Sequence, residues 1–130
     1  MILVMDDEEV MRDTIGAMLA ALGYSVILTS DGHEALTRFD EERRAQRDVA
    51  GVILDLTVAG GMGGKEVATK IRDHDAGVPI FVVSGYADDP AMAHPTEYGF
   101  TASICKPFRK AELGEILEKH LRGDDFSFPR

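Results

Sequence analysis

The stretch VILDLTVAGGMGGKE, residues 52–66, joins an apolar run of strand length to a glycine-rich loop. The run ends on Asp55, and no cation follows it before Lys65. A strand that is buried on both faces has a continuous apolar sequence, as residues 49–54 do. We therefore expect a buried strand that brings one carboxylate to its own end, with a counter-charge supplied from elsewhere in the chain.

Strand-like and helix-like segments alternate on both sides of this stretch. Short apolar runs predict further strands at residues 2–5, 26–29, 78–83 and 100–105. Helices are predicted at residues 8–22, 64–73 and 109–122. A further helix should begin at the capping residue Ser30 and finish with a solvated, charged end at 41–47. The weakest helix is predicted within 88–98, where Pro95 interrupts it. Five strands alternating with five helices indicate an α/β fold, a parallel sheet covered by helices on both faces.

Composition narrows the class of protein. The 130 residues suit one domain, and 45% hydrophobic with 28% charged residues is ordinary for a globular protein. The formal net charge of −9 argues against a basic nucleic-acid-binding surface and favours a metal cation or a basic partner. A single cysteine, Cys105, which we read as a core residue, fits a reducing, cytoplasmic setting. No apolar run approaches the ~20 residues that span a bilayer, so we expect no membrane contact.

Polar residues follow four of the predicted strands at the point where each ends. They are Asp6 and Asp7 after the first strand, Asp55 at the end of the third, Ser84 after the fourth and Lys106 after the fifth. The carboxyl ends of parallel strands share one edge of the sheet, where ligands bind in such folds. Lys106, fifty-one residues further along, would then supply the counter-charge of Asp55.

Three carboxylates at one edge repel one another and raise one another's pKa values. A hard divalent cation relieves this repulsion, and oxygen ligands with room for water favour Mg²⁺. With a metal bound, one carboxylate can act as a nucleophile toward phosphorus and form an aspartyl phosphate. The predicted chemistry is therefore metal-dependent phosphoryl transfer.

Over residues 2–122 the chain resembles the receiver domain of two-component response regulators. The resemblance rests on Asp6-Asp7, on Asp55 after an apolar strand, on Ser84-Gly85 and on Lys106-Pro107-Phe108, in this order. It implies a flavodoxin-like (βα)5 fold with strand order 2-1-3-4-5. The domain would cover residues 1–122, and 123–130 would be a tail.

The resemblance also implies a metal site. Asp7 and Asp55 would bind Mg²⁺ together with the backbone carbonyl of Thr57, and Asp6 would act through water. The Lys106–Pro107 peptide would be cis.

In the same reading Asp55 is the phosphoacceptor, Lys106 pairs with the phosphate and the Ser84 hydroxyl hydrogen-bonds a phosphoryl oxygen. The phosphoryl group would come from a histidine of a sensor kinase or a histidine phosphotransfer protein. Such a domain promotes its own phosphorylation and dephosphorylation without being a conventional enzyme. Thr57 and Tyr86 would flank the site and tune hydrolysis.

Two features qualify the resemblance. Family members often carry an aromatic residue three positions before the lysine, and here that residue is Ser103, with Tyr98 or Phe100 as possible substitutes. The stretches LDLTVAGGMGGKE and SGYADDPAMAHPTEYGF are similar to receivers at the C-terminus of hybrid sensor histidine kinases. We expect an excised domain of that kind, with a free-standing single-domain regulator as the alternative.

Other functions fit the sequence less well. A phosphate-binding P-loop needs glycine and Ser or Thr where Ala59 and Glu66 stand. A haloacid-dehalogenase-type phosphatase needs a second aspartate where Thr57 stands. The histidines have no metal-ligand spacing. The open alternative is a pseudo-receiver that binds proteins without carrying phosphate.

Overall fold

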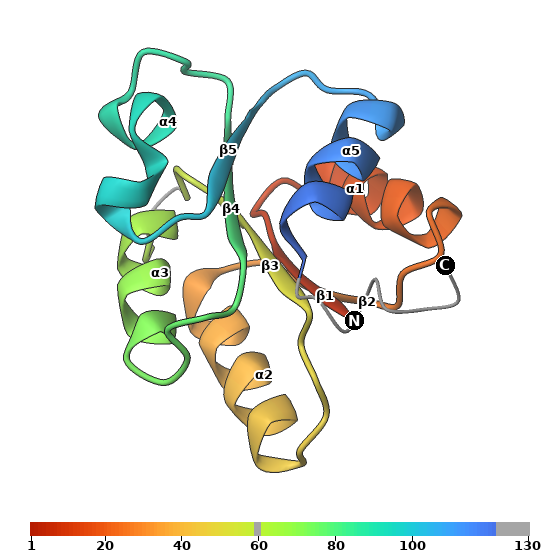
Figure 1. Cartoon of the computed structure of the whole chain (residues 1–130), viewed down its shortest axis with the longest axis vertical. Coiled ribbons are helices and arrows are strands. Elements are labelled where there is room, and N and C mark those ends of the chain that lie inside the picture. Colours follow the sequence, from red (N-terminus) through yellow and green to blue (C-terminus); the bar gives the residue numbers. More distant parts are fainter. Residues whose placement is uncertain (59–60, 122–130) are drawn as a thin grey trace.

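The computed structural model describes residues 1–58 and 61–121, and a five-stranded parallel sheet forms its centre (Figure 1). The strands are β1 Ile2–Met5, β2 Val26–Thr29, β3 Gly51–Asp55, β4 Ile80–Ser84 and β5 Ala102–Cys105. Their order in the sheet is β2-β1-β3-β4-β5. This order confirms the predicted flavodoxin-like fold.

Helices cover both faces of the sheet. They are α1 Glu9–Ala21, α2 Gly32–Arg44, α3 Gly64–Arg72, α4 Pro90–Ala93, the 3₁₀ helix η1 Pro95–Tyr98 and α5 Lys110–His120. Figure 1 shows α1 and α5 on one side of the sheet and α2, α3 and α4 on the other. None of the helices in the described ranges is long and apolar enough to cross a bilayer.

Alternation along each strand divides the core into two clusters. In β1, Leu3 and Met5 pack with α2 and α3, whereas Ile2 and Val4 pack with α1 and α5. Successive side chains of a strand point to opposite faces, so a fully apolar strand serves both cores. All residues of β1, β3 and β4 are buried, and these strands hold the candidate site.

The start of α2 corrects one prediction. Asp31, not Ser30, caps this helix, because its side-chain Oδ1 accepts a hydrogen bond from the Glu34 backbone N–H at 2.8 Å. Ser30 instead donates its backbone N–H and its hydroxyl to Glu34 Oε1, at 2.8 and 3.0 Å. The two contacts are reciprocal and fix the entry of the chain into α2.

The end of α2 corrects a second prediction. Residues 41–47 are not uniformly solvated, since Glu42 is only 4% exposed. The chain turns back after the helix through Gln46, which has a positive φ of 60°, and Arg47 then reaches Glu42. A carboxylate can be buried here because an arginine is brought to it.

The segment from α4 to β5 fits one expectation and refutes another. Pro90 starts α4, and Pro95 starts the separate short helix η1, as the proline spacing predicts. Cys105, by contrast, is exposed and not a core residue. It lies on an edge strand where Ile104 takes the inward position, so its neighbour points outward. The predicted tail, 123–130, lies outside the described residues.

An acidic cluster at the carboxyl ends of the strands

The register of the sheet brings the predicted residues to one edge. Met5 pairs with Leu54, so Asp6 leaves β1 level with Asp55 at the end of β3. Ser84 pairs with Cys105, so Lys106 leaves β5 beside it. Asp6, Asp7, Asp55 and Lys106 meet at this edge, and Ser84 ends the strand next to that of Asp55.

Three carboxylates form the centre of the cluster. One carboxylate oxygen from each of Asp6, Asp7 and Asp55 lies within 4.8 Å of the others. Asp6 and Asp55 are buried, at 1% and 7% exposure, whereas Asp7 is exposed. The cluster is therefore closed to solvent at Asp6 and Asp55 and open to solvent at Asp7.

Asp6 is held more firmly than the sequence indicates. Its Oδ1 accepts the Glu8 backbone N–H at 2.9 Å, and its backbone carbonyl accepts Arg12 Nη1 at 2.9 Å. Arg12 belongs to no motif that marks this site. The available signal was an arginine one turn into the helix that follows the acidic pair, and sequence reasoning missed it.

Lys106 supplies the counter-charge predicted for Asp55, but it is shared. Its Nζ lies 3.3 Å from Asp6 Oδ2 and 3.8 Å from Asp55 Oδ1. One ammonium group thus stands among three carboxylates, nearest to Asp6. The local charge remains negative, as a cation site requires.

Burial and repulsion perturb the acidity of Asp55. Burial, followed by the charge of Asp6, raises its pKa from 3.8 to about 6, and the repulsion from Asp7 adds to this. Lys106 and the Thr57 backbone N–H, 3.4 Å from Asp55 Oδ1, lower the pKa and offset the rise only in part. Its partners thus stabilise the ionised carboxylate only in part, and a buried carboxyl group whose pKa is perturbed in this way is a candidate functional group.

Ser84 and the Lys106–Pro107 peptide complete the edge. The Ser84 side chain is buried, and its Oγ accepts the Tyr86 backbone N–H at 3.0 Å, which leaves the hydroxyl proton for another acceptor. The Lys106 backbone N–H donates to the Ser84 carbonyl at 2.8 Å. The Lys106–Pro107 peptide is cis, as the resemblance implies.

The glycine loop matters because α3 begins against the backbone of Asp55. A Cβ on Gly64 would lie 2.7 Å from the Asp55 carbonyl oxygen, and one on Gly63 would lie 3.0 Å from that of Leu56. A side chain at Gly64 would force the backbone to shift, and one at Gly63 would make a tight contact. The loop therefore lets the first turn of α3 pack directly against the end of β3.

The donor set fits a hard divalent cation. Carboxylate oxygens are the ligands that Mg²⁺ prefers, and the exposed Asp7 leaves room for the waters that Mg²⁺ retains. After burial, the negative charges of Asp6 and Asp7 also raise the pKa of Asp55, and such an ion would neutralise them.

The model of the response regulator receiver domain matches residues 2–118. The chain belongs to this family. Receiver domains are modules of two-component signalling, so the fold and the acidic edge have a common explanation.

Curated relatives place the domain within longer proteins. A probable transcriptional regulator from Guillardia theta is 34% identical over 93% of this chain and 45% of its own length. The DNA-binding response regulator MtrA of Mycobacterium tuberculosis is 33% identical over 95% of this chain and 51% of its own length. The chain thus spans about half the length of the curated relatives it matches.

Solved receiver structures have the same fold. The receiver domain of the sensor histidine kinase PA1611 from Pseudomonas aeruginosa, which has a magnesium ion coordinated in its active-site cleft, is 29% identical over 92% of this chain and 94% of that chain, with a TM-score of 0.73. The receiver domain of NtrX from Brucella abortus is 25% identical, with a TM-score of 0.81, covering 92% of this chain and 97% of that one.

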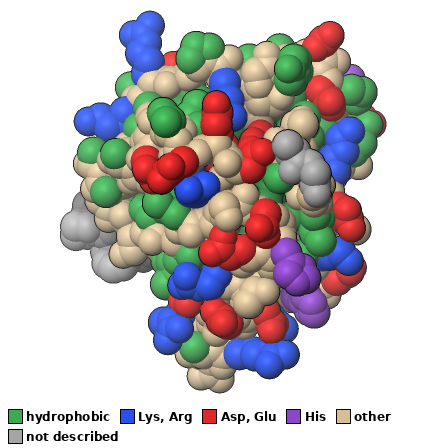
Figure 2. Space-filling view, turned by 180° about the vertical axis from the view of Figure 1, so that it is seen from behind, with side chains coloured by type: hydrophobic (Ala, Val, Ile, Leu, Met, Phe, Trp, Pro, Cys, Tyr) green, Lys and Arg blue, Asp and Glu red, His purple; other side chains and the backbone are tan. Residues whose placement is uncertain are grey.

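Two narrower predictions gain no support from the curated relatives. The curated proteins are described as transcriptional or DNA-binding regulators, which does not support a hybrid kinase as the parent protein. The description of MtrA as DNA-binding equally leaves the predicted absence of direct nucleic-acid binding unsupported. On the part of the described surface visible in Figure 2, acidic and basic side chains are interspersed, and the basic ones form no extended patch.

Proposed function

We propose that this receiver domain accepts a phosphoryl group on Asp55 and that Mg²⁺ is required. The observation that carries the proposal is the environment of Asp55. Its carboxylate is buried beside those of Asp6 and Asp7, and its only ion pair in the described residues is with the shared Lys106. A buried carboxylate with a purely structural role would be fully paired. This one keeps an oxygen for a ligand.

Asp7 and Asp55 would hold the metal, with Asp6 acting through water and the Thr57 backbone carbonyl as a further ligand. When bound, Mg²⁺ supplies charge neutralisation for the phosphoryl oxygens. Lys106 would pair with a phosphoryl oxygen on Asp55, because its ammonium group already lies 3.8 Å from Asp55 Oδ1. The Ser84 hydroxyl has a proton to donate to a second oxygen.

The phosphodonor we propose is a phosphorylated histidine of a sensor kinase or a phosphotransfer domain. An Asp55 carboxylate oxygen attacks phosphorus and forms a P–O bond while the P–N bond breaks. The electron pair of that bond returns to the imidazole, which takes a proton from water. With its pKa at about 6, Asp55 is mostly ionised at pH 7 and is therefore a competent nucleophile.

The experiment is intact mass spectrometry after incubation with a small-molecule acyl phosphate and Mg²⁺. Wild-type protein should gain one phosphoryl group, and both Asp55→Asn and wild type without Mg²⁺ should gain none. Glu42→Gln is the matched control, since it removes a similarly buried carboxylate far along α2 and should leave the modification intact. Failure of wild type to gain the group, even from a competent phosphohistidine donor, would instead indicate a phosphate-independent binding module.

The parent protein is a separate proposal. A hybrid sensor histidine kinase is supported by the two sequence stretches quoted above and by the likeness to the PA1611 receiver. The DNA-binding relatives favour a response regulator instead. Transfer rates would discriminate, because a hybrid-kinase receiver should exchange phosphoryl groups faster with a phosphotransfer protein than with a sensor kinase.

A further inference from the structure

Lys65 joins two segments that leave the sheet at the acidic edge. It is the second residue of α3, and its Nζ lies 3.7 Å from Asp89 Oδ1 and 4.9 Å from the centroid of the Tyr98 ring. Asp89 precedes α4, and Tyr98 ends η1. One ammonium group therefore contacts both ends of the segment 89–98.

We call the contacts of Lys65 with Asp89 and Tyr98 the Lys65 bridge, and its base in α3 is fixed relative to Asp55. The Gly64 backbone N–H donates to the Leu56 carbonyl at 3.2 Å, and the Gly64 Cα packs so closely that a Cβ would meet the Asp55 carbonyl oxygen at 2.7 Å. A displacement of the Asp55 main chain must therefore move the first turn of α3. Lys65 moves with that turn.

The far end of the bridge is connected to Ser84 through two successive turns. The Tyr86 backbone N–H donates to Ser84 Oγ at 3.0 Å, and the Asp89 backbone N–H donates to the Tyr86 carbonyl at 3.1 Å. Asp89 Oδ1, the oxygen nearest Lys65, also accepts the Ala91 backbone N–H at 2.9 Å and so caps α4. A change at Ser84 therefore reaches the same oxygen.

Other contacts fasten the segment away from the site. Ser103 Oγ donates to the Met92 carbonyl at 2.8 Å, and Arg72 Nε at the end of α3 donates to the Gly99 carbonyl at 3.1 Å. These contacts anchor the segment to β5 and to the far end of α3. Lys65 differs from them because its own helix turn rests on the phosphoacceptor strand.

We propose that Lys65 is a coupling residue that carries a change at Asp55 to α4 and η1 through Asp89 and Tyr98. The inference rests on the proposed function, since it needs a phosphoryl group at Asp55 to start the change. An ion pair and a cation–π contact that are both partly exposed to solvent are each weak, so both can break and re-form as the loops move. We expect the bridge to have a second arrangement, and both sites would bias the balance between the two.

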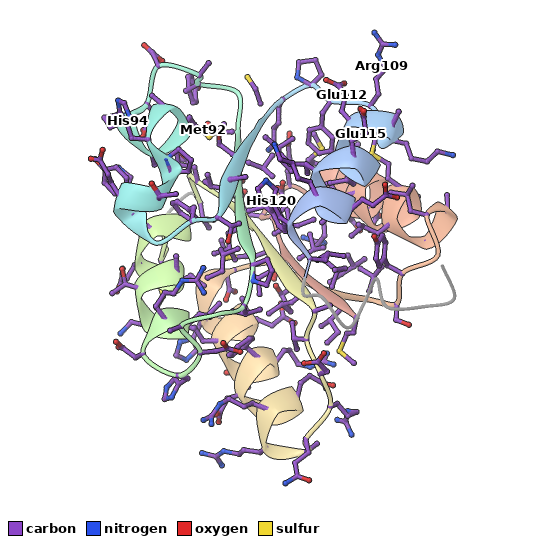
Figure 3. The ribbon with its side chains drawn as sticks, in the orientation of Figure 1. Met92, His94, Arg109, Glu112, Glu115 and His120 are labelled. Atoms are coloured by element: carbon purple, nitrogen blue, oxygen red, sulfur yellow. The ribbon has the colours of Figure 1, made fainter. Side chains whose placement is uncertain are left out.

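Amide NMR spectra test the proposal, with beryllium fluoride and Mg²⁺ as the probe of the phosphorylated state. Figure 3 places Met92 and His94 at α4, on the other side of β5 from Glu112 and Glu115 of α5. In wild type the probe should shift the amides of Asp55, Met92 and His94. In Lys65→Met the shifts at Met92 and His94 should fall to half or less, while those at Asp55, Glu112 and Glu115 stay as in wild type.

Two variants separate coupling from a general effect of the substitution. Lys65→Arg keeps the charge and the ring contact and should restore the shifts at Met92 and His94. Lys70→Met removes another exposed lysine of α3, away from this bridge, and should behave as wild type. Full shifts at Met92 and His94 in Lys65→Met would overturn the coupling role, whereas no shift at Asp55 in wild type would refute the proposed function itself.

Discussion

Two carboxylates of this domain are similarly buried and have opposite surroundings. Glu42, at the end of α2, is 4% exposed, and Asp55, at the end of β3, is 7% exposed. Arg47 donates to Glu42 through Nε at 2.7 Å and Nη2 at 3.1 Å. Asp55 has a shared lysine at 3.8 Å and a backbone N–H at 3.4 Å.

The pKa values of the two groups move in opposite directions. Hydrogen bonding from Arg47 is the main cause that lowers the pKa of Glu42. Burial is the main cause that raises the pKa of Asp55 to about 6. Because the two groups are similarly buried, their partners decide the difference, and Asp55, with its shared lysine and one long hydrogen bond, is the one prepared for a ligand.

The largest expected difference is in stability without metal. The raised pKa of Asp55 makes its ionisation costly, and the cost is absent below pH 4, grows up to pH 6 and is complete above it. Asp55→Asn should therefore stabilise the domain at pH 7 by on the order of 2 kcal/mol, and the gain should vanish as the pH falls to 4. Glu42→Gln should destabilise it at pH 7, because the pairing with Arg47 is lost. Urea unfolding in EDTA measures both, and stabilisation by both variants would break the contrast.

Removing the shared cation should sharpen the contrast. Lys106→Met leaves Asp6 and Asp55 without their ion pair, and we expect a loss of about 1 to 3 kcal/mol at pH 7. The loss should shrink in Lys106→Met combined with Asp55→Asn, since one of the repelling charges is gone. Equal losses in the two backgrounds, measured by the same urea unfolding, would mean that the charge of Lys106 does not act on that of Asp55 and that the loss arises at Asp6 or from packing.

Mg²⁺ should separate the two carboxylates in a third way. At ten times its Kd, an ion that binds only the folded state stabilises it by about 1.4 kcal/mol. Wild type and Glu42→Gln should both gain this amount, whereas Asp55→Asn should lose most of it. Thermal unfolding at constant ionic strength is the measurement, and an equal gain in all three proteins would place the ion elsewhere.

The smallest effect concerns the second arginine at Glu42. Arg38 Nη2 lies 3.8 Å from Glu42 Oε2, and its side chain is 40% exposed. Because Arg47 still bonds Glu42 through two nitrogens, Arg38→Met should change stability by less than about 0.5 kcal/mol. A larger loss on urea unfolding would show that Glu42 depends on both arginines.

The acidic edge was predictable because it follows from simple rules. Apolar runs of strand length gave the strands, and parallel strands must place the residues after them at one edge, so Asp6, Asp7, Asp55 and Lys106 meet there. The third strand begins two residues later than predicted. Val49 and Ala50 are buried but precede the β-ladder, which starts at Gly51.

The contacts that were missed depend on how the chain folds back on itself. Residues 41–47 have the composition of a solvated helix end, and the burial of Glu42 depends on the left-handed Gln46 that returns Arg47 to it. The contact of Lys65 with Tyr98 joins residues far apart in sequence and has no spacing rule. Exposure of Cys105 follows from its place on an edge strand, which requires the strand order.

The most direct test of the contrast is a titration of the two carboxyl groups by carbon NMR, without metal and with Mg²⁺. We predict that Asp55 titrates with an apparent midpoint near 6 and Glu42 below its ordinary value, 4.5, in the metal-free protein. Saturating Mg²⁺ should lower the midpoint of Asp55 and leave that of Glu42 unchanged. An Asp55 that titrates at its ordinary value and does not respond to Mg²⁺ would contradict the account.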